Sequence, residues 1–511
     1  MNDWTAGYVT DLEYTFGYYT ELNPLRAKLA LLNQRLSSPE IQNACELGFG
    51  QGLSINIHAA SSSTAWAGTD FNPSHAAFAQ ELAVASKCDA RVFDDAFEEF
   101  VARTDLPDFD YIGLHGIWSW ISDKNRVALV DFFRRKLRIG GVLYISYNTL
   151  PGWSGFTPMR HLLSEHARVL GASGQGMVAN IDQSIDFAEK LLAVNPKFAG
   201  TSPQVAERLS KIKGTNRNYL AHEYFNRDWH PMHFSTMENW LAPAKLSFAC
   251  SAHYLDLIDG INITAEQAAL LNSIKDANFR ESVRDYIVNQ QFRRDYWIKG
   301  PRRLSGLAQA ELLRKQRVVL VRNRADAKLK VAGAIGEAEL REEIYKPILD
   351  LMADFKPRTI GQVEKSLSAS GLKFGTLYEA MMILIGAGDL SPVQEDATIA
   401  RARQSTDRLN AAILERTRTG AEIDYLASPV TGGGITVNKI PQLFLIARSQ
   451  GKKSTSDWAQ FAWQFFQSQG QKLLKDGAAL ETAEENVAEL QKQADAFEQA
   501  QLPILRALGI A

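Results

Sequence analysis

The stretch ELGFGQG, from Glu46 to Gly52, lies directly after an apolar run that begins at Asn43 and directly before a segment of helical pattern. Glycine is needed at such a junction because only a residue without a side chain lets the backbone turn sharply and approach a ligand closely. The order of strand, glycine-rich loop and helix is typical of sheets that bind a nucleotide-like ligand at the carboxyl ends of their strands. The stretch therefore predicts a Rossmann-like α/β fold, with a cofactor site in roughly the first 150 residues.

Short apolar runs around this stretch alternate with helical segments, which predicts a parallel sheet wound by helices. Five strands are expected: NACELGF from Asn43, STAWAGTD ending at Asp70, DARVF ending at Phe93, FDYIGLH ending at His115 and GGVLYISYN ending at Asn148. Between the last two, KNRVALVDFFRRKLRIGG predicts an amphipathic helix that ends at Gly140 and Gly141. HPMHF and KLSFACSAHYLDLID, on either side of a helix over STMENWLAPA, are expected to add the antiparallel strand pair that closes the sheet.

The acidic residues near the glycine-rich loop indicate which cofactor it binds. A nicotinamide site would read G-x-G-x-x-G, whereas this loop reads Glu-x-Gly-x-Gly-x-Gly; an acid there repels phosphate but suits the cationic amino group of S-adenosylmethionine (AdoMet). Asp70, at the end of the next strand, can accept both ribose hydroxyls, the alternative being a helix-capping aspartate. Asp95 is placed to meet the adenine amino group, and Asp94 is its rival for that role. We therefore expect AdoMet as the cofactor.

The segments HGIWSW and SYNTLPGW follow the fourth and fifth strands, at the edge where such sheets bind ligands. Methyl transfer is an in-line displacement that needs a held, neutral nucleophile and no metal or covalent catalyst, so no metal site is predicted. For the tryptophans, a packed core beneath inserted helices is an equally good interpretation, and the histidine can instead be a structural residue. The candidates for the acceptor side of the site are His115, Trp118, Trp120, Tyr147, Asn148 and Trp153.

The 511-residue length indicates a modular protein, because one hydrophobic core organises roughly 100–200 residues. Three predicted helices and a short hairpin between Glu337 and Val393 indicate a winged helix within a mainly helical C-terminal part. The cofactor and partner-contact motifs are expected in separable halves of the chain. We divide it into an AdoMet-binding core (1–155), a helical insertion for a lid or for dimerisation (156–225), the end of the core sheet with a regulatory-type helical region (226–300), a winged-helix-like domain (301–400) and a C-terminal helical domain (401–511).

The motifs ELGFGQG, GTDFNP, DDAF, FDYIGLHGIWSWI and SYNTLPGW, in this order, resemble those of bacterial class I AdoMet-dependent methyltransferases that carry a methyltransferase regulatory domain. That family includes the protein-lysine methyltransferases acting on rickettsial outer-membrane protein. The likeness continues through HEYFN, PMHF and VRDYIVNQQFRRDYW. It implies AdoMet-binding roles for Glu46, Gly48, Gly50, Asp70 and Asp95 and an active-site position for His115, Trp118 and Trp120. With neighbouring residues, the expected cofactor set is Tyr19, Glu46, Gly48, Phe49, Gly50, Gly52, Asp70, Phe71, Asp95, Ala96 and His115.

Charge and cysteine content narrow the class of partner. The formal net charge of −2 gives no overall attraction to nucleic acid or an anionic membrane, no apolar stretch approaches the ~20 residues of a membrane span, and three cysteines without paired spacing fit a reducing cytoplasm. We expect a cytoplasmic methyltransferase acting on lysine side chains of a protein substrate, with no nucleic-acid or membrane partner and a possible homodimer. The alternatives are a small-molecule methyltransferase of a biosynthetic pathway and an AdoMet-sensing regulatory protein.

Overall fold

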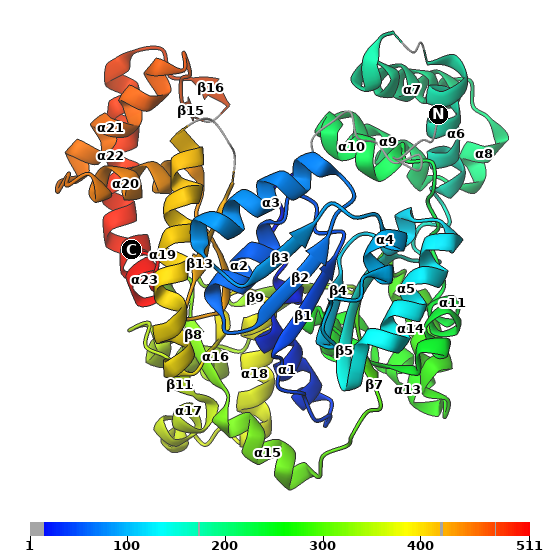
Figure 1. Cartoon of the computed structure of the whole chain (residues 1–511), viewed down its shortest axis with the longest axis horizontal. Helices are drawn as coiled ribbons and strands as arrows, with labels where there is room; N and C mark the ends of the chain where they lie inside the picture. The colour runs from blue at the N-terminus through cyan, green and yellow to red at the C-terminus, as the bar shows by residue number, and fades with distance from the viewer. Residues whose placement is uncertain (1–14, 172–173, 419–422, 476) are drawn as a thin grey trace.

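A computed structural model describes residues 15–171, 174–418, 423–475 and 477–511 of the chain. Its centre is one seven-stranded sheet (Figure 1). The strands are β1 (Asn43–Leu47), β2 (Ala65–Thr69), β3 (Ala90–Phe93), β4 (Phe109–Leu114), β5 (Leu137–Asn148), β6 (Leu246–Ser251) and β7 (Phe292–Lys299). They follow the order β3-β2-β1-β4-β5-β7-β6, with β1 to β5 parallel and β7 antiparallel to both neighbours. The predicted class I methyltransferase sheet and its first five strands are confirmed.

The strand that pairs with β5 is not the one predicted. HPMHF forms no strand: its Met232 makes an isolated bridge with Thr149, and its last residue, Phe234, begins α11 (Phe234–Leu241). The pairing strand is β7, which lies outside both predicted strand segments, in the part of residues 226–300 expected as a regulatory-type helical region. This segment forms a helix followed by a strand. The helix α14 (Ala277–Val288) ends at Asn289, which has a left-handed conformation, and the chain then becomes extended.

The helix before β5 also ends earlier than predicted. α5 (Asp123–Lys136) stops at Lys136, so Gly140 and Gly141 lie inside β5 instead of terminating the helix. Leu137 is buried and pairs with Phe109, which fixes the start of the strand directly after the helix.

Helices pack around the sheet, and further helices form an insertion and a C-terminal part beside it. The N-terminal helices are α1 (Pro24–Asn33), α2 (Leu53–Ser61), α3 (Pro73–Ser86) and α4 (Phe97–Ala102). Between β5 and α11 the predicted helical insertion is confirmed, at upper right in Figure 1, as α6 (Thr157–Leu170), α7 (Gly176–Ala193), α8 (Lys197–Thr201), α9 (Gln204–Lys213) and α10 (Arg217–Tyr224). Between β6 and α14 lie the short α12 (Asp259–Asn262) and α13 (Ala265–Ser273). The insertion has its own buried cluster, which includes Trp120, Trp153 and Trp229.

The C-terminal part begins with α15 (Gly306–Lys315), β8 (Arg317–Leu320), β9 (Lys330–Gly333) and β10 (Gly336–Glu339). It continues with α16 (Glu342–Met352), β11 (Arg358–Thr359), α17 (Ile360–Ser366), α18 (Phe374–Gly386) and β12 (Leu390–Val393). The three predicted helices are present, although Glu337 to Glu339 belong to β10 instead of the first helix. The winged helix is not confirmed, because β12, the strand directly after α18, forms no hairpin in the described structure and pairs instead with the upstream β8 in the order β11-β8-β12.

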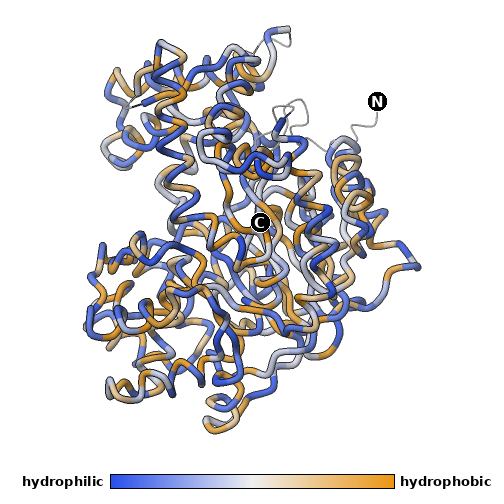
Figure 2. Tube along the Cα trace, turned by 90° about the vertical axis from the view of Figure 1, so that its left-hand side faces the viewer, coloured by the Kyte–Doolittle hydropathy of each residue, from blue (hydrophilic) through white to orange (hydrophobic). Residues whose placement is uncertain are grey.

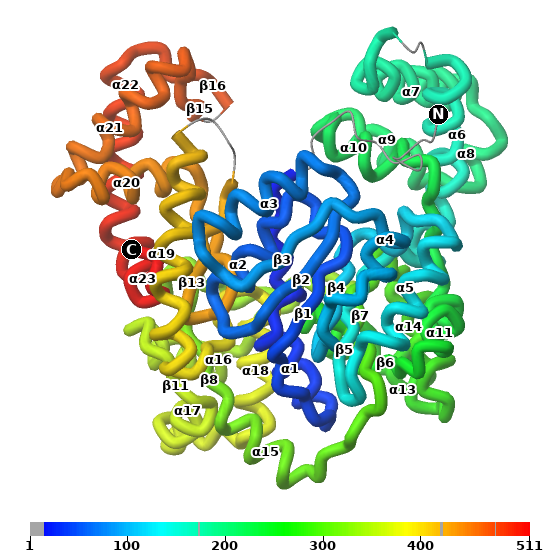
Figure 3. The backbone as a smooth tube through the Cα atoms, viewed as in Figure 1, coloured from blue at the N-terminus to red at the C-terminus, as the bar shows by residue number. Residues whose placement is uncertain are grey.

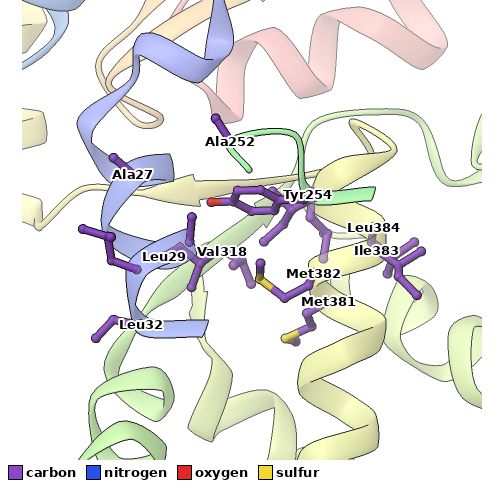
Figure 4. Packing of buried hydrophobic residues seen from close by; sticks show 14 of the residues in the cluster. Ala27, Leu29, Leu32, Ala252, Tyr254, Val318, Met381, Met382, Ile383 and Leu384 are labelled. Carbon is purple, nitrogen blue, oxygen red and sulfur yellow. The ribbon is translucent and has the colours of Figure 1, made fainter. Parts of the chain in front are cut away.

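The helix α18 lies inside the molecule. Figure 4 shows its residues Met381 and Met382 packed near Tyr254 and the leucines of α1. The Tyr254 hydroxyl donates a hydrogen bond of 2.6 Å to the Arg26 carbonyl, which ties this cluster to α1. Most side chains of α18 from Leu377 to Ile385 are buried, so this helix is part of the core of the molecule.

The last segment of the chain packs against the sheet's own helices. It comprises α19 (Asp396–Arg418), β13 (Tyr425–Ser428), β14 (Gly433–Thr436), α20 (Lys439–Ser449), α21 (Thr455–Ser468), β15 (Leu474–Lys475), β16 (Ala478–Ala479), α22 (Ala483–Ala496) and α23 (Leu502–Ala507). In Figure 3 α19 runs beside α2 and α3, and Leu409 shares a buried cluster with Leu53 and Ile57 of α2. Figure 2 shows hydrophobic and hydrophilic residues alternating along the chain, as expected of elements with one buried side. Among the described helices, none is both long enough and apolar enough to cross a bilayer.

Candidate active site

A cavity of about 450 Å³ opens where the parallel strands end. Its walls come from the loops after β1, β2, β3 and β4, from the segment before α1, and from α10 with the residues that follow it. Among the predicted cofactor residues, those that line it are Tyr19, Gly48, Phe49, Gly50, Asp70, Phe71, Asp95, Ala96 and His115. Residues predicted from separate strand ends are therefore brought together in one place.

The glycine-rich loop forms one wall because its backbone is left-handed at three positions. Gly48, Gly50 and Gly52 have φ values of +70°, +57° and +69°, which side-chain-bearing residues rarely adopt. A Cβ atom on Gly48 would come within 2.6 Å of Ile117, another residue of the cavity wall. Gly52 does not line the cavity; it lies at the start of α2, where a Cβ atom would collide with Ala79.

The Asp70 carboxylate organises the ends of β1 and β2. Its Oδ2 accepts a 2.9 Å hydrogen bond from the Gly50 backbone N–H, and its Oδ1 accepts one of 3.1 Å from that of Asn72. His75 Nδ1 lies 3.2 Å from Oδ1. This side chain therefore also shapes the two loops against which a ligand would lie.

Glu46 lies one residue before the end of β1 and is only 1% exposed. Its Oε2 atom has no hydrogen-bond partner among the residues that the structure describes. Burial, with a smaller effect from the neighbouring Asp70 charge, raises the pKa of Glu46 from its ordinary 4.5 to about 8. Glu46 is not part of the cavity wall, and a buried, unpartnered carboxyl at this position is costly unless a positive group meets it.

The loop after β3 distinguishes the two neighbouring aspartates of FDDAF. Asp95 lines the cavity and Asp94 is exposed outside it. The Asp95 carboxylate accepts a 2.9 Å hydrogen bond from Arg103, and its backbone carbonyl accepts one from the Thr69 hydroxyl. Asp95 is thus held in place from both sides.

His115 and Tyr19 form a stacked pair at the cavity, with ring centroids 3.7 Å apart. The Nδ1 atom of His115 lies 2.7 Å from the Tyr144 hydroxyl. Loss of hydration lowers the pKa of His115 to about 4, an effect that the Arg294 charge strengthens and Glu21 opposes. At neutral pH this imidazole is uncharged and serves as a flat, polar wall.

The other acceptor-side candidates divide between the cavity and the core. Trp120 lines the cavity, whereas Trp118 is fully buried beside Trp240 with a ring-centroid distance of 6.0 Å. Trp153 packs in the insertion, 5.0 Å from the Trp229 ring. Trp118 and Trp153 are therefore core residues, as the alternative interpretation of the tryptophans expected.

Tyr147 and Asn148 also lie outside the cavity wall. The Tyr147 hydroxyl donates a 2.9 Å hydrogen bond to Asp295, which in turn accepts hydrogen bonds from Arg293. Asn148 uses its backbone: its N–H donates to the Ser119 hydroxyl at 2.8 Å. Both residues stabilise the end of β5.

Sequence reasoning missed one wall of the cavity. The motif HEYFN, at the end of α10, contributes His222, Glu223 and Asn226, and the next residues contribute Arg227 and Asp228. The motif was visible as part of a family resemblance. Its position could not be deduced, because it depends on how the insertion folds back over the sheet.

Comparisons with known proteins agree with this architecture. Residues 216–299 match the family model described as a predicted methyltransferase regulatory domain. The chain is 39% identical to the Synechocystis protein sll1526, over 99% of this chain and all of that one. It is 24% identical to the Rickettsia prowazekii protein RP789 over 54% of this chain and 49% of that one.

A solved structure shares the fold over nearly the whole chain. It is that of PKMT2 from Rickettsia typhi in complex with AdoHcy, with a TM-score of 0.70 and 15% sequence identity. The match covers 98% of this chain and all of that one. The similarity extends to the insertion and the C-terminal helices, so the entire arrangement recurs in that protein.

Glu46 predicts a pH-dependent stability of the ligand-free protein. The folded state holds the Glu46 proton more tightly than the unfolded chain, so raising the pH from about 5 to about 8 lowers the free energy of unfolding. We expect Glu46→Gln to remove this loss. At pH 8 the free energy of unfolding of the variant should exceed that of the wild type by more than about 1.4 kcal/mol, the equivalent of one pKa unit. Denaturant unfolding at both pH values measures it.

The control for this prediction is Glu40→Gln, at a side chain that is 87% exposed. Its free energy of unfolding should match that of the wild type at both pH values. Parallel pH dependence in the wild type and in Glu46→Gln would contradict the account of Glu46.

Proposed function

We propose that this chain, which belongs to the same family as the Synechocystis protein sll1526, is an AdoMet-dependent methyltransferase acting on lysine side chains of a protein. The observation that carries the proposal is the convergence of the left-handed glycine-rich loop and the Asp70 carboxylate on one cavity at the ends of β1 and β2. This is the edge at which open α/β sheets bind their ligands.

The residues present fit AdoMet. The buried Oε2 of Glu46, without a partner among the described residues, suits a positively charged amino group. The Asp70 carboxylate has acceptor capacity for ribose hydroxyls beside its bonds to the loop, and Asp95 is available on the same wall for the adenine. A side chain at Gly48 would collide with Ile117, so the loop can form this part of the cavity wall only with glycine at that position.

AdoMet, when bound, supplies a methyl group on a positively charged sulfur. The protein's own residues then have to hold the acceptor, exclude water and keep the nucleophile neutral. The stacked Tyr19 and His115 and the indole of Trp120 provide a wall of rings for this purpose. His115 is uncharged at neutral pH and so does not repel a cationic acceptor.

A lysine acceptor is supported by the charge of the cavity wall and by the resemblance to protein-lysine methyltransferases. The carboxylates on the wall outnumber its lysine and arginine side chains: Asp70, Asp95, Glu98, Glu223 and Asp228 against Lys124 and Arg227. An excess of acid favours a substrate that arrives as a cation.

The proposed role of Asp70 predicts a loss of cofactor affinity. Asp70→Ala should weaken AdoMet binding at least tenfold, because a hydrogen bond to a charged group contributes roughly 1.5–3 kcal/mol and about 1.4 kcal/mol corresponds to a factor of ten. Titration calorimetry measures this, and circular dichroism checks the fold of each variant. Asp94→Ala, at an exposed carboxylate after the neighbouring strand β3, is the control and should bind like the wild type. Equal affinity of the folded Asp70→Ala protein would contradict the ribose role.

The acceptor class is tested by incubating the full chain with methyl-labelled AdoMet and fractionated lysate from a bacterium encoding this family. We expect label in protein, located on lysine by mass spectrometry of the labelled bands. Label confined to small molecules would favour a biosynthetic methyltransferase, and AdoMet binding without any transfer would favour a sensor.

A further inference from the structure

Glu223 lies in the last turn of α10, at the edge of the cavity. Its carboxylate lines the main cavity together with residues of the cofactor loops. Among the described residues, none forms a hydrogen bond or ion pair with it. A carboxylate facing a cavity in this state has its full hydrogen-bonding capacity available for a ligand.

The other cavity carboxylates are already engaged. Asp70 accepts from Gly50 and Asn72, and Asp95 accepts from Arg103. Glu98 pairs with Lys124 at 2.8 Å, and Asp228 lies 3.3 Å from Arg227 and 3.6 Å from His230. Glu223 is thus the member of this set, within the described part of the chain, that has no partner.

The surroundings of Glu223 keep it in place without neutralising it. Arg160 of α6 is buried and donates a 2.7 Å hydrogen bond to the Asn226 carbonyl, just after α10. Its guanidinium lies 4.9 Å from the Trp229 ring centroid and 5.9 Å from that of Trp120. Arg160 therefore fixes the segment that carries Glu223 and contributes its charge from a distance.

Electrostatics decides which cavity group is the better base. Burial raises the pKa of Glu223 to about 7, although the Arg160 charge favours its ionised form. The other titratable groups around it are Tyr219, Tyr224 and His222 on α10, and Arg208 of α9 beside Tyr224. His115, whose pKa lies at about 4, is a weaker base, and a general base works best when its pKa is near the working pH.

We propose that Glu223 binds the amine of the acceptor and takes up its proton before methyl transfer, an inference that rests on the proposed function. The acceptor ammonium gives one proton to the Glu223 carboxylate and becomes a neutral amine. The amine nitrogen then forms a bond to the methyl carbon with its free electron pair, as the bond from that carbon to sulfur breaks and its electron pair stays on sulfur. The product is a methylated ammonium, and the proton on Glu223 returns to solvent.

The test compares Glu223→Gln with the wild type, using poly-L-lysine as the acceptor and labelled AdoMet from about pH 6 to about pH 10. General-base catalysis contributes about 100-fold or more, so we expect at least that loss of turnover near neutral pH. The remaining activity should rise towards the ordinary pKa of a free amine, about 10.4. AdoMet affinity and the melting temperature should stay close to wild type, because the substitution removes a charge and keeps the shape.

The matched control is Glu207→Gln, on α9 of the same insertion, whose side chain is 72% exposed and pairs with Lys211. It should leave the rate and its pH dependence unchanged. Glu223→Asp should recover part of the rate with a wild-type pH profile.

Three results would overturn the inference. They are an unchanged pH profile in Glu223→Gln, a loss of rate explained by a lowered melting temperature, and a wild type that methylates lysate proteins but not poly-L-lysine at any pH. Failure of the proposed function has a different signature, since the wild type would then neither bind AdoMet nor label any component of the lysate.

Discussion

The hydrogen bonds from the backbone N–H groups of Gly50 and Asn72 to the Asp70 carboxylate are the contacts on which the site depends. They join the loops that follow two neighbouring parallel strands, β1 and β2. Such bonds form only if the first loop turns back sharply, which its left-handed glycines allow. One carboxylate thereby fixes the shape of two loops, and the buried carboxyl of Glu46, whose pKa burial raises to about 8, lies near the end of β1 beside them.

The rest of the chain encloses this edge of the sheet. The insertion brings α10 to the cavity, and Arg160 holds the segment after α10 by its bond to Asn226. On another side, α19 and α20 share a buried cluster with α2, the helix that begins directly after the glycine-rich loop. Removing the C-terminal half would expose Leu53 and Ile57 of that helix to water. This packing argues against the separable halves expected from the sequence.

The sequence predicted the features that depend on local pattern. Apolar runs and glycine positions identified β1 to β5 and the loop from Glu46, because these elements follow from alternation and backbone freedom. The same reasoning failed at β7, where Arg293 and Asp295 interrupt the apolar pattern. These charges lie in a central strand because they pair with each other and with Asp285, and such pairing appears only when α14 packs on the sheet.

The site shows the same limit of prediction. Of the six acceptor-side candidates only His115 and Trp120 line the cavity, and the sequence could not tell that Trp120 faces it while Trp118, two residues earlier, faces the core. Both tryptophans belong to one short helical turn, Trp118–Trp120, whose orientation is set by tertiary packing. Glu223 was missed because the insertion must fold before α10 reaches the cavity.

The central claim is that the cavity between the Glu46–Gly52 loop and Asp70 holds AdoMet. A crystal structure of the full chain grown with AdoHcy tests it most directly. The account predicts the ribose hydroxyls at the Asp70 carboxylate, the amino group on the side of Glu46, and the adenine near Asp95. Density for AdoHcy elsewhere on the molecule, or a ribose turned away from Asp70, would contradict it.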